Sequence, residues 1–264
     1  MKCIEFIGVP ASGKSFYKNK FEKKFNCISK QRLIINFFLK KRKNNFKNKF
    51  ICYLIIFYYS NQFKYLRNFF KSKRQVFKLR NKINFSTTQS NSSFFRKYFN
   101  LNQFYEDIVC LTFKDLRINK DKLFILIDNE IKKINQSTIF KKRLYFWVIE
   151  NFTSISLANK QKKNLNYLIL DEGILHRIFL IYSLSKNNKR FLNEAIKLYR
   201  LKVDVYHVNV QIDILKKNIY LRNSKKDGYI YKQHKNISSE ILQYNKFVKT
   251  LKKKNKVHTI FNKY

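Results

Sequence analysis

The chain has 264 residues, with 57 Lys and Arg against 16 Asp and Glu, and therefore a formal net charge of +41. Hydrophobic residues make up 45% and aromatic residues 17%, so the chain can build a core and we do not expect wholesale disorder. The charge alone suggests nucleic acid or an anionic membrane surface as a partner. Lys, Asn, Ile, Phe and Tyr are all frequent, however, which is typical of an AT-rich genome, so codon choice competes with function as the cause.

Cysteine spacing and hydropathy bear on the compartment. Cys3, Cys27, Cys52 and Cys110 show no paired spacing, and the chain opens on a strand-like segment rather than on a signal peptide. We therefore expect a cytoplasmic protein. The apolar run at residues 50–59 is shorter than the roughly 20 residues that cross a bilayer, so no transmembrane helix is expected there.

A glycine-containing loop near the N-terminus is the strongest motif. Residues 8–15 read GVPASGKS and match GxxxxGK[ST], between a predicted strand at 3–7 and a predicted helix at 15–25. The loop holds three of the five Gly and Pro residues of the chain. In such loops, backbone N–H groups and the helix N-terminus hold phosphate groups. The predicted nucleotide-binding residues are Gly8, Val9, Pro10, Ala11, Ser12, Gly13, Lys14 and Ser15.

Two side chains of this loop have separate expected roles. Lys14 is expected to reach the β- and γ-phosphates, and the Ser15 hydroxyl is expected to ligate Mg²⁺. The alternative is a chance glycine-rich turn before a helix. The succession of strand, loop and helix favours the phosphate loop.

The middle of the chain, residues 31–164, contains no chemical motif. Between Glu22 and Glu106 there is no acidic side chain, while the basic clusters at 40–43 and 71–74 and many aromatic residues fall in this interval. A basic, aromatic-rich surface would suit an anionic acceptor, a membrane face or nucleic acid. Codon bias acting on a solvated helical insertion is the competing explanation.

A second buried strand is predicted at residues 167–170, and it ends in two acids. An acid at the carboxyl end of a parallel strand is placed to support Mg²⁺, and we expect Asp171 to do so. Glu172 would lie beside it, at the edge where open parallel sheets bind ligands. The alternative is a strand that ends at a solvated acidic turn.

His176 and Arg177 follow these acids by about one helical turn, on the apolar stretch 174–184. A cation near the carboxyl end of a strand can reach a phosphate or a substrate oxygen. We therefore expect Arg177 to bind substrate, with His176 as a second candidate. Arg177 can equally extend to solvent or pair with Asp171.

The C-terminal part predicts the rest of a sheet. Residues 205–210 and 257–261 are strand-like, and apolar residues recur at helical spacing between 241 and 251. The order strand, helix, strand predicts an α/β fold with a mostly parallel sheet covered by helices on both faces.

GVPASGKS at 8–15, LILDEGILHR at 168–177 and the basic segment 220–228 together resemble P-loop kinases of small molecules. This group includes thymidylate and deoxynucleoside kinases and kinase-like proteins of surface-polysaccharide gene clusters. The resemblance implies a three-layer P-loop NTPase fold that uses ATP and Mg²⁺. It implies one domain over 1–264, with a core from 1–30 and 165–264 and a helical acceptor-side insertion at 31–164.

The resemblance also implies a mobile lid over residues 222–228. Arg222, or Lys225 or Lys226, would neutralise charge on the transferred phosphoryl group. The alternative is that these three cations have no role in catalysis, since a chain with so many Lys and Arg residues places cations near almost any loop.

Related kinases commonly place a carboxylate base shortly after the P-loop helix, where this chain has none. Glu172 is therefore our choice of base for a hydroxyl acceptor, with Asp171, Glu106 or Asp107 as alternatives. If the acceptor is already a phosphate, no strong base is needed.

The sequence thus favours an ATP- and Mg²⁺-dependent kinase in which Lys14, Asp171, Glu172 and Arg222 are catalytic. Nucleoside, sugar and lipid-linked acceptors all stay open. A P-loop nucleotide hydrolase, a basic nucleic-acid-binding protein with an incidental P-loop and a membrane-surface protein are the alternatives.

Overall fold

The computed structural model describes residues 1–9, 11–41, 50, 52–53, 101–161, 166–170, 172–186, 188–199, 203–224, 237–253 and 255–262. Within these ranges, side chains are described except at 101–103, 219–224 and 237–240. The chain forms two compact units, one from Met1–Ile28 and Phe113–Tyr264, the other from Ser29–Thr112. Residues 113–160, which lie within the expected insertion, therefore pack with the sheet.

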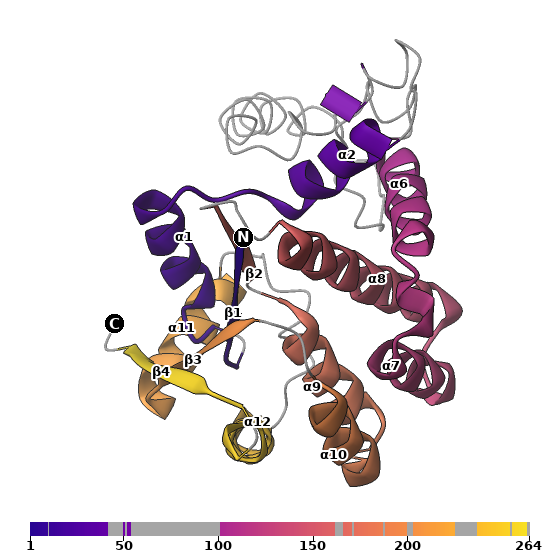
Figure 1. Ribbon diagram of the computed structural model, residues 1–264. Coiled ribbons are helices and arrows are strands. Elements are labelled where there is room, and N and C mark those ends of the chain that lie inside the picture. Colours follow the sequence, from indigo (N-terminus) through magenta and orange to yellow (C-terminus); the bar gives the residue numbers. More distant parts are fainter. Residues whose placement is uncertain are drawn as a thin grey trace, which may run out of the picture. The chain divides into compact units, whose positions relative to one another are not determined.

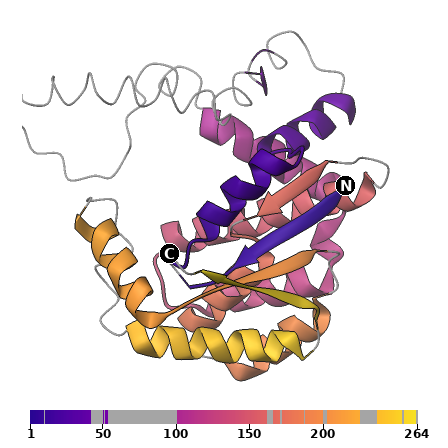
Figure 2. The same cartoon turned by 90° about the vertical axis from the view of Figure 1, so that its left-hand side faces the viewer.

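The first unit is built on a parallel sheet of four described strands in the order β2-β1-β3-β4. These are β1 (Lys2–Ile7), β2 (Tyr167–Leu170), β3 (Asp204–Val210) and β4 (Val257–Asn262). β1 pairs with β2 in the register Glu5↔Leu170 and with β3 in the register Ile7↔His207. The carboxyl ends of the strands therefore meet at one edge of the sheet (Figure 2). The α/β fold and the parallel sheet predicted from the sequence are confirmed.

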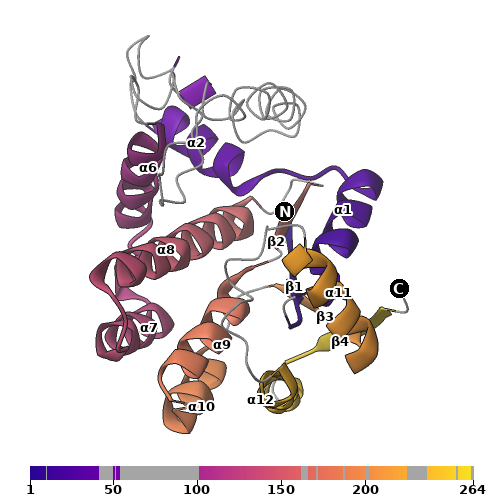
Figure 3. The same ribbon diagram turned by 180° about the vertical axis from the view of Figure 1, so that it is seen from behind.

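Helices cover both faces of this sheet. They are α1 (Lys14–Lys24), α7 (Lys122–Lys133), α8 (Thr138–Lys160), α9 (Ile174–Leu184), α10 (Lys189–Leu198), α11 (Ile212–Ser224) and α12 (Ile237–Lys252), with a 3-10 turn at Ile118–Lys120. α1 contacts β1 and β2 on one face, and α8 and α9 contact β1 on the other (Figure 1). α7, α9 and α10 pack together on the side opposite α1 (Figure 3).

The face toward α1 is aromatic. Ile4 and Phe6 of β1 are buried beneath Tyr17 and Phe21 of α1. The rings of Phe6 and Phe21 meet edge to face with centroids 5.3 Å apart. Burying a ring such as that of Phe6 contributes roughly 2–3 kcal/mol, so the alternation of side chains along β1 fixes where the helix lies.

The opposite face is closed by α9 and α12. Phe179 of α9 contacts Tyr244 and Phe247 of α12, with ring centroids 4.5 and 5.4 Å apart. His207 of β3 stacks on Tyr244. The helix predicted from the spacing of apolar residues between 241 and 251 is confirmed. These residues lie in α12, and Tyr244, Phe247, Val248 and Leu251 are buried in the core.

Side-chain caps begin several of these helices. Asp121 accepts hydrogen bonds from the Leu123 and Phe124 N–H groups at the start of α7. Asn188 accepts from the Phe191 N–H group at the start of α10. Such caps satisfy backbone donors that a helix leaves without intrahelical acceptors.

The second unit contains α2 (Lys30–Lys41) and most of α6 (Leu101–Asp115). α2 buries Leu33, Ile34, Ile35 and Phe38. In α6, buried residues recur at helical spacing, so each helix has an apolar side that packs.

No helix in the described part of the chain is long and apolar enough to cross a membrane. Most of the apolar run at 50–59 lies outside the described residues. The four cysteines are free thiols.

Candidate functional site

The loop after β1 takes a backbone form that few residues adopt. Ala11 has a φ of 64° and Gly13 a φ of 95°, both in the left-handed region. Gly13 is the N-cap of α1, so the chain turns sharply from the loop into the helix. A left-handed φ favours glycine, which explains Gly13, while at Ala11 the loop holds a strained residue. Pro10 lies outside the described residues.

Gly8 is needed for close approach rather than for a positive φ. A Cβ built at Gly8 would lie 2.5 Å from Ser12 Oγ and 2.8 Å from the Val208 carbonyl oxygen. Ser12 is fully buried, and its Oγ has no hydrogen-bond partner among the described residues. The loop is therefore folded tightly against the end of β3.

Lys14 bends back over this loop. Its Nζ donates to the carbonyl oxygens of Gly8 and Val9, at 2.8 and 3.0 Å. The ammonium group therefore lies within the curve of the loop instead of extending along α1. This position brings one full positive charge to the carboxyl edge of the sheet.

Among the described residues, the start of α1 has no acidic side chain of its own and no side-chain cap. The first intrahelical bonds run from the Phe16 and Tyr17 N–H groups to the Gly13 carbonyl oxygen. The partial positive charge of the helix end therefore adds to that of Lys14, and the Ser15 side chain is exposed beside it.

Two distant segments hold the loop in place. Asn262, at the end of β4, donates from Nδ2 to the Ser12 carbonyl oxygen at 3.0 Å and is buried. Asn218 of α11 donates to the Ala11 carbonyl oxygen at 3.3 Å, and Leu215 packs on Ala11. The loop is therefore braced by α11 and by the end of β4.

A pocket of about 590 Å³ opens beside these braces. It is lined by Asn209, Val210, Gln211, Ile214, Phe261 and Asn262. Phe261 is 66% exposed, so its ring is available for a flat partner. Asn262 lines the pocket and contacts Ser12, so the pocket adjoins the loop.

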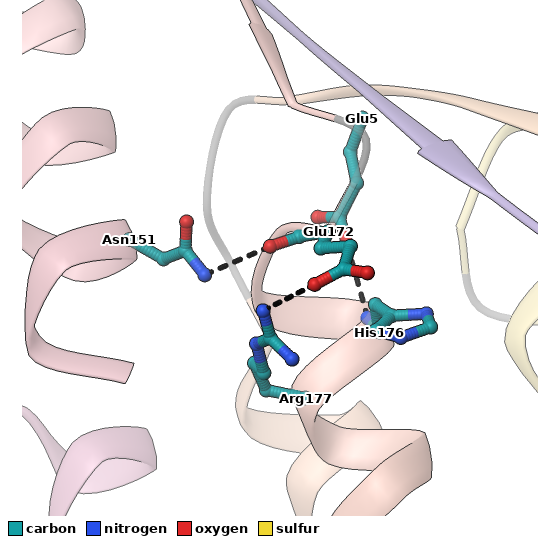
Figure 4. Close-up of polar contacts among 5 residues, drawn as sticks. All are labelled: Glu5, Asn151, Glu172, His176 and Arg177. Atoms are coloured by element: carbon teal, nitrogen blue, oxygen red, sulfur yellow. Dashed lines mark hydrogen bonds and ion pairs between the residues drawn. The ribbon is translucent and has the colours of Figure 1, made fainter. Parts of the chain in front are cut away.

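A second polar group lies beyond β2 (Figure 4). The Arg177 guanidinium donates to Glu172 Oε2 at 2.6 Å and lies over the Trp147 ring, 4.5 Å from its centroid. Asn151 of α8 donates to the Glu172 carbonyl oxygen at 3.0 Å. The Arg177 side chain is only 8% exposed, whereas the Glu172 side chain is 53% exposed. The structure therefore pairs Arg177 with Glu172, and its expected substrate contact stays a prediction.

Sequence reasoning missed Glu5. This fully buried acid of β1 accepts a hydrogen bond from the His176 N–H group at 3.1 Å. Burial raises the pKa of Glu5 to about 7, while hydrogen bonds from the α9 backbone and the charge of Arg177 act in the opposite direction. A charged residue inside an otherwise apolar strand was the available signal.

Several expected site residues, or their side chains, lie outside the described part of the structure. Asp171 is outside it, and so are Lys225 and Lys226. Arg222 lies in the last turn of α11, one helical turn beyond Asn218, and its side chain is not described. The described residues contain no cluster of three or more His, Cys, Asp or Glu side chains that could hold a metal. The expected Mg²⁺ ligands, Ser15 and Asp171, therefore stay a prediction.

Comparison with known proteins adds no relative: no family model, no curated protein and no solved structure matches this chain.

Proposed function

We propose that this protein is an ATP- and Mg²⁺-dependent phosphotransferase of the P-loop kinase type that acts on a small molecule in the cytoplasm. One observation carries the proposal. A tight loop with left-handed Ala11 and Gly13 leads into the uncapped N-terminus of α1, with the Lys14 ammonium group folded into the loop. Helix ends and lysines of this kind bind phosphate.

The charges of the loop support phosphate as its ligand. The Lys14 ammonium group now binds two neutral carbonyl oxygens, which are weaker acceptors than phosphate oxygens. A polyphosphate placed at the start of α1 would draw Lys14 away from Gly8 and Val9. The tightly folded backbone would stay in place because Asn262 and Asn218 hold it.

The adjoining pocket suits the remainder of a nucleotide. It offers the exposed Phe261 ring for stacking and polar groups of Asn209 and Gln211 for hydrogen bonds. Since Asn262 links this pocket to the loop, one ligand can occupy both.

Glu172 is assigned to the acceptor. Its carboxylate is held by Arg177 on one side while about half of the side chain stays exposed, so an acceptor can approach it. Glu172 would orient a hydroxyl group and take its proton as the hydroxyl oxygen attacks the γ-phosphorus and the nucleoside diphosphate leaves.

The remaining assignments complete the proposal. Ser15 and Asp171 would hold Mg²⁺, which neutralises phosphate charge when bound. Arg222 lies one helical turn beyond Asn218, which contacts the loop, and it is proposed to stabilise the transferred phosphoryl group.

The test is transfer of labelled γ-phosphate from ATP to pooled small molecules, with wild type and Lys14→Ala compared. Labelled product that is absent from the Lys14→Ala reaction supports the proposal. Release of labelled phosphate without any acceptor would favour the hydrolase instead. Equal turnover by both proteins would overturn the role of the loop. Salt-sensitive RNA or DNA binding that survives Lys14→Ala would favour a nucleic-acid-binding protein.

A further inference from the structure

The most deeply buried carboxyl group among the described residues is that of Glu5, in the middle of β1. Its strand neighbours Ile4 and Phe6 pack toward α1, so Glu5 faces the opposite side, where α9 begins. A buried acid is costly unless its charge is compensated. The charge of Glu5 therefore needs nearby groups that compensate it.

The compensating groups lie in the first turn of α9. Glu5 Oε1 accepts from the His176 N–H group, and the Ile174 and Leu175 N–H groups also stabilise the charged carboxylate. The positive charge of Arg177 acts in the same direction. Glu5 thus supplies from β1 the cap that no side chain near Gly173 provides for α9.

The turn before α9 is shaped to receive this carboxyl group. A Cβ at Gly173 would lie 2.4 Å from Glu5 Cδ and within 2.8 Å of both carboxyl oxygens. The φ of Gly173 is −84°, so close approach is the reason for glycine here. The Glu5 side chain therefore lies directly against the turn that carries Glu172.

Glu5 links the two parts of the proposed active site. The strand that carries it runs directly into the phosphate loop, which begins three residues later at Gly8. Pairing of β2 with β1 ends at Leu170, opposite Glu5, so the ladder does not fix the residues that follow. The described contacts of Glu172 come from Asn151 and Arg177, on helices.

We propose that Glu5 is a positioning residue, which fixes the Glu172–Gly173 turn and the start of α9 relative to the strand that carries the phosphate loop. This inference rests on the proposed phosphotransferase function. Glu5 acts through Glu172, so its loss slows phosphoryl transfer more than it weakens nucleotide binding.

Glu5→Gln separates positioning from stability. The amide keeps the size of the side chain, but it removes the negative charge that the N–H groups of α9 and Arg177 stabilise, so the first turn of α9 is held less firmly. The same change removes the cost of burying a charge, so the fold is not weakened in proportion to the lost contacts. If Glu5 had only a structural role, kcat would fall only as far as the stability of the fold falls.

The experiment compares wild type, Glu5→Gln, Glu5→Asp and the control Glu130→Gln. Glu130 is a buried acid of α7 that accepts from Asn188 at 2.8 Å, away from the loop. For Glu5→Gln we expect kcat to fall roughly 10- to 100-fold while KM for ATP changes less than about threefold. Glu5→Asp should recover part of kcat, and Glu130→Gln should leave it near wild type.

Two further readouts follow the turn itself. Amide hydrogen exchange at Ile174, Leu175 and His176 should accelerate about tenfold or more in Glu5→Gln, with α1 unchanged. The fluorescence of Trp147, the only tryptophan, should also change in Glu5→Gln. Arg177 lies over the Trp147 ring and pairs with Glu172, so a shift of the turn that carries Glu172 moves Arg177 relative to the ring.

The outcomes separate this inference from the proposed function. Unchanged kcat in an active Glu5→Gln protein, or equal losses in kcat, KM and global stability, would overturn the positioning role. If wild type turns over no nucleotide, the proposed function fails, and the exchange and fluorescence readouts decide whether Glu5 holds the turn. No change in either readout would overturn the inference in that case also.

Discussion

The carboxyl group of Glu5 lies directly against the backbone of Gly173, 168 positions away in the sequence; a Cβ at Gly173 would come within 2.4 Å of Glu5 Cδ. This contact joins the strand that leads into the phosphate loop to the turn that follows β2. It also explains the third glycine of the chain, which has no positive φ.

Gly173→Ala should therefore destabilise the protein through this clash. We expect a loss of about 1–3 kcal/mol in the free energy of unfolding, measured by chemical denaturation. In a Glu5→Ala background the three atoms nearest to the added methyl group are absent. The coupling energy between the two substitutions should then exceed about 0.5 kcal/mol, and additive effects would contradict the contact.

Glu5 should also make stability depend on pH. Burial raises its pKa from 4.5 to about 7, so between these pH values the folded state binds more protons than the unfolded state. The free energy of unfolding therefore falls as pH rises across this window, by roughly 3 kcal/mol at most. Glu5→Gln should abolish this fall, as denaturation at several pH values would show. Parallel curves for the two proteins would refute the assignment.

His207 should change the free energy of unfolding with pH in the opposite direction. Burial first, and then the charges of Lys252 and Lys14, lower its pKa from 6.5 to about 4. Between these values the unfolded state binds more protons, so stability rises with pH and is lost as pH falls. The slopes from Glu5 and His207 oppose each other in wild type. Glu5→Gln should therefore uncover a steeper acid limb, and adding His207→Gln should flatten it.

The pairing of Arg177 with Trp147 and Glu172 gives a prediction that needs no substrate. Arg177→Lys keeps the charge but loses the planar group that lies over the ring, at a cost of about 1 kcal/mol. The emission of Trp147 should change at the same time. Arg190→Lys, on the exposed side of α10, is the control and should alter neither quantity. Identical emission in wild type and Arg177→Lys would argue against the contact.

Local pattern in the sequence was sufficient for the elements around the site. The apolar runs at 167–170 and 174–184 form β2 and α9 with those bounds. Both runs were recognisable because most of their side chains are apolar and buried. The loop at 8–15 was recognisable because its glycines are required by backbone geometry. The strand predicted at 205–210 is β3, extended by one residue at its start.

The contacts that complete the site could not be predicted in this way. Asn262 reaches Ser12 across 250 positions, and Glu5 reaches His176 across 171. Such pairs depend on strand order and on the placement of α9, and neither leaves a periodic signal. The pairing of Arg177 with Glu172 and its position over the Trp147 ring were not predicted, because only the fold brings α8 to the guanidinium.

Asn262 offers a test of how the loop is braced. Asn262→Asp replaces the donor to the Ser12 carbonyl oxygen with an acceptor, which should cost about 1–3 kcal/mol of stability. The new negative charge should also weaken ATP binding. Asn209→Asp places the same charge in the same pocket without the loop contact, so its stability should stay near wild type. Equal destabilisation by both substitutions would contradict the brace.

The central claim is that the loop at 8–15 binds the phosphates of a nucleotide through Lys14. Equilibrium binding of a non-hydrolysable ATP analogue tests it most directly, with Lys20→Ala as a control that removes an exposed lysine from the same helix. Lys14→Ala should weaken binding roughly 10- to 100-fold, the value of one charged hydrogen bond of about 1.5–3 kcal/mol, while Lys20→Ala stays close to wild type. Equal affinity of wild type and Lys14→Ala, or no binding by wild type, would contradict the claim.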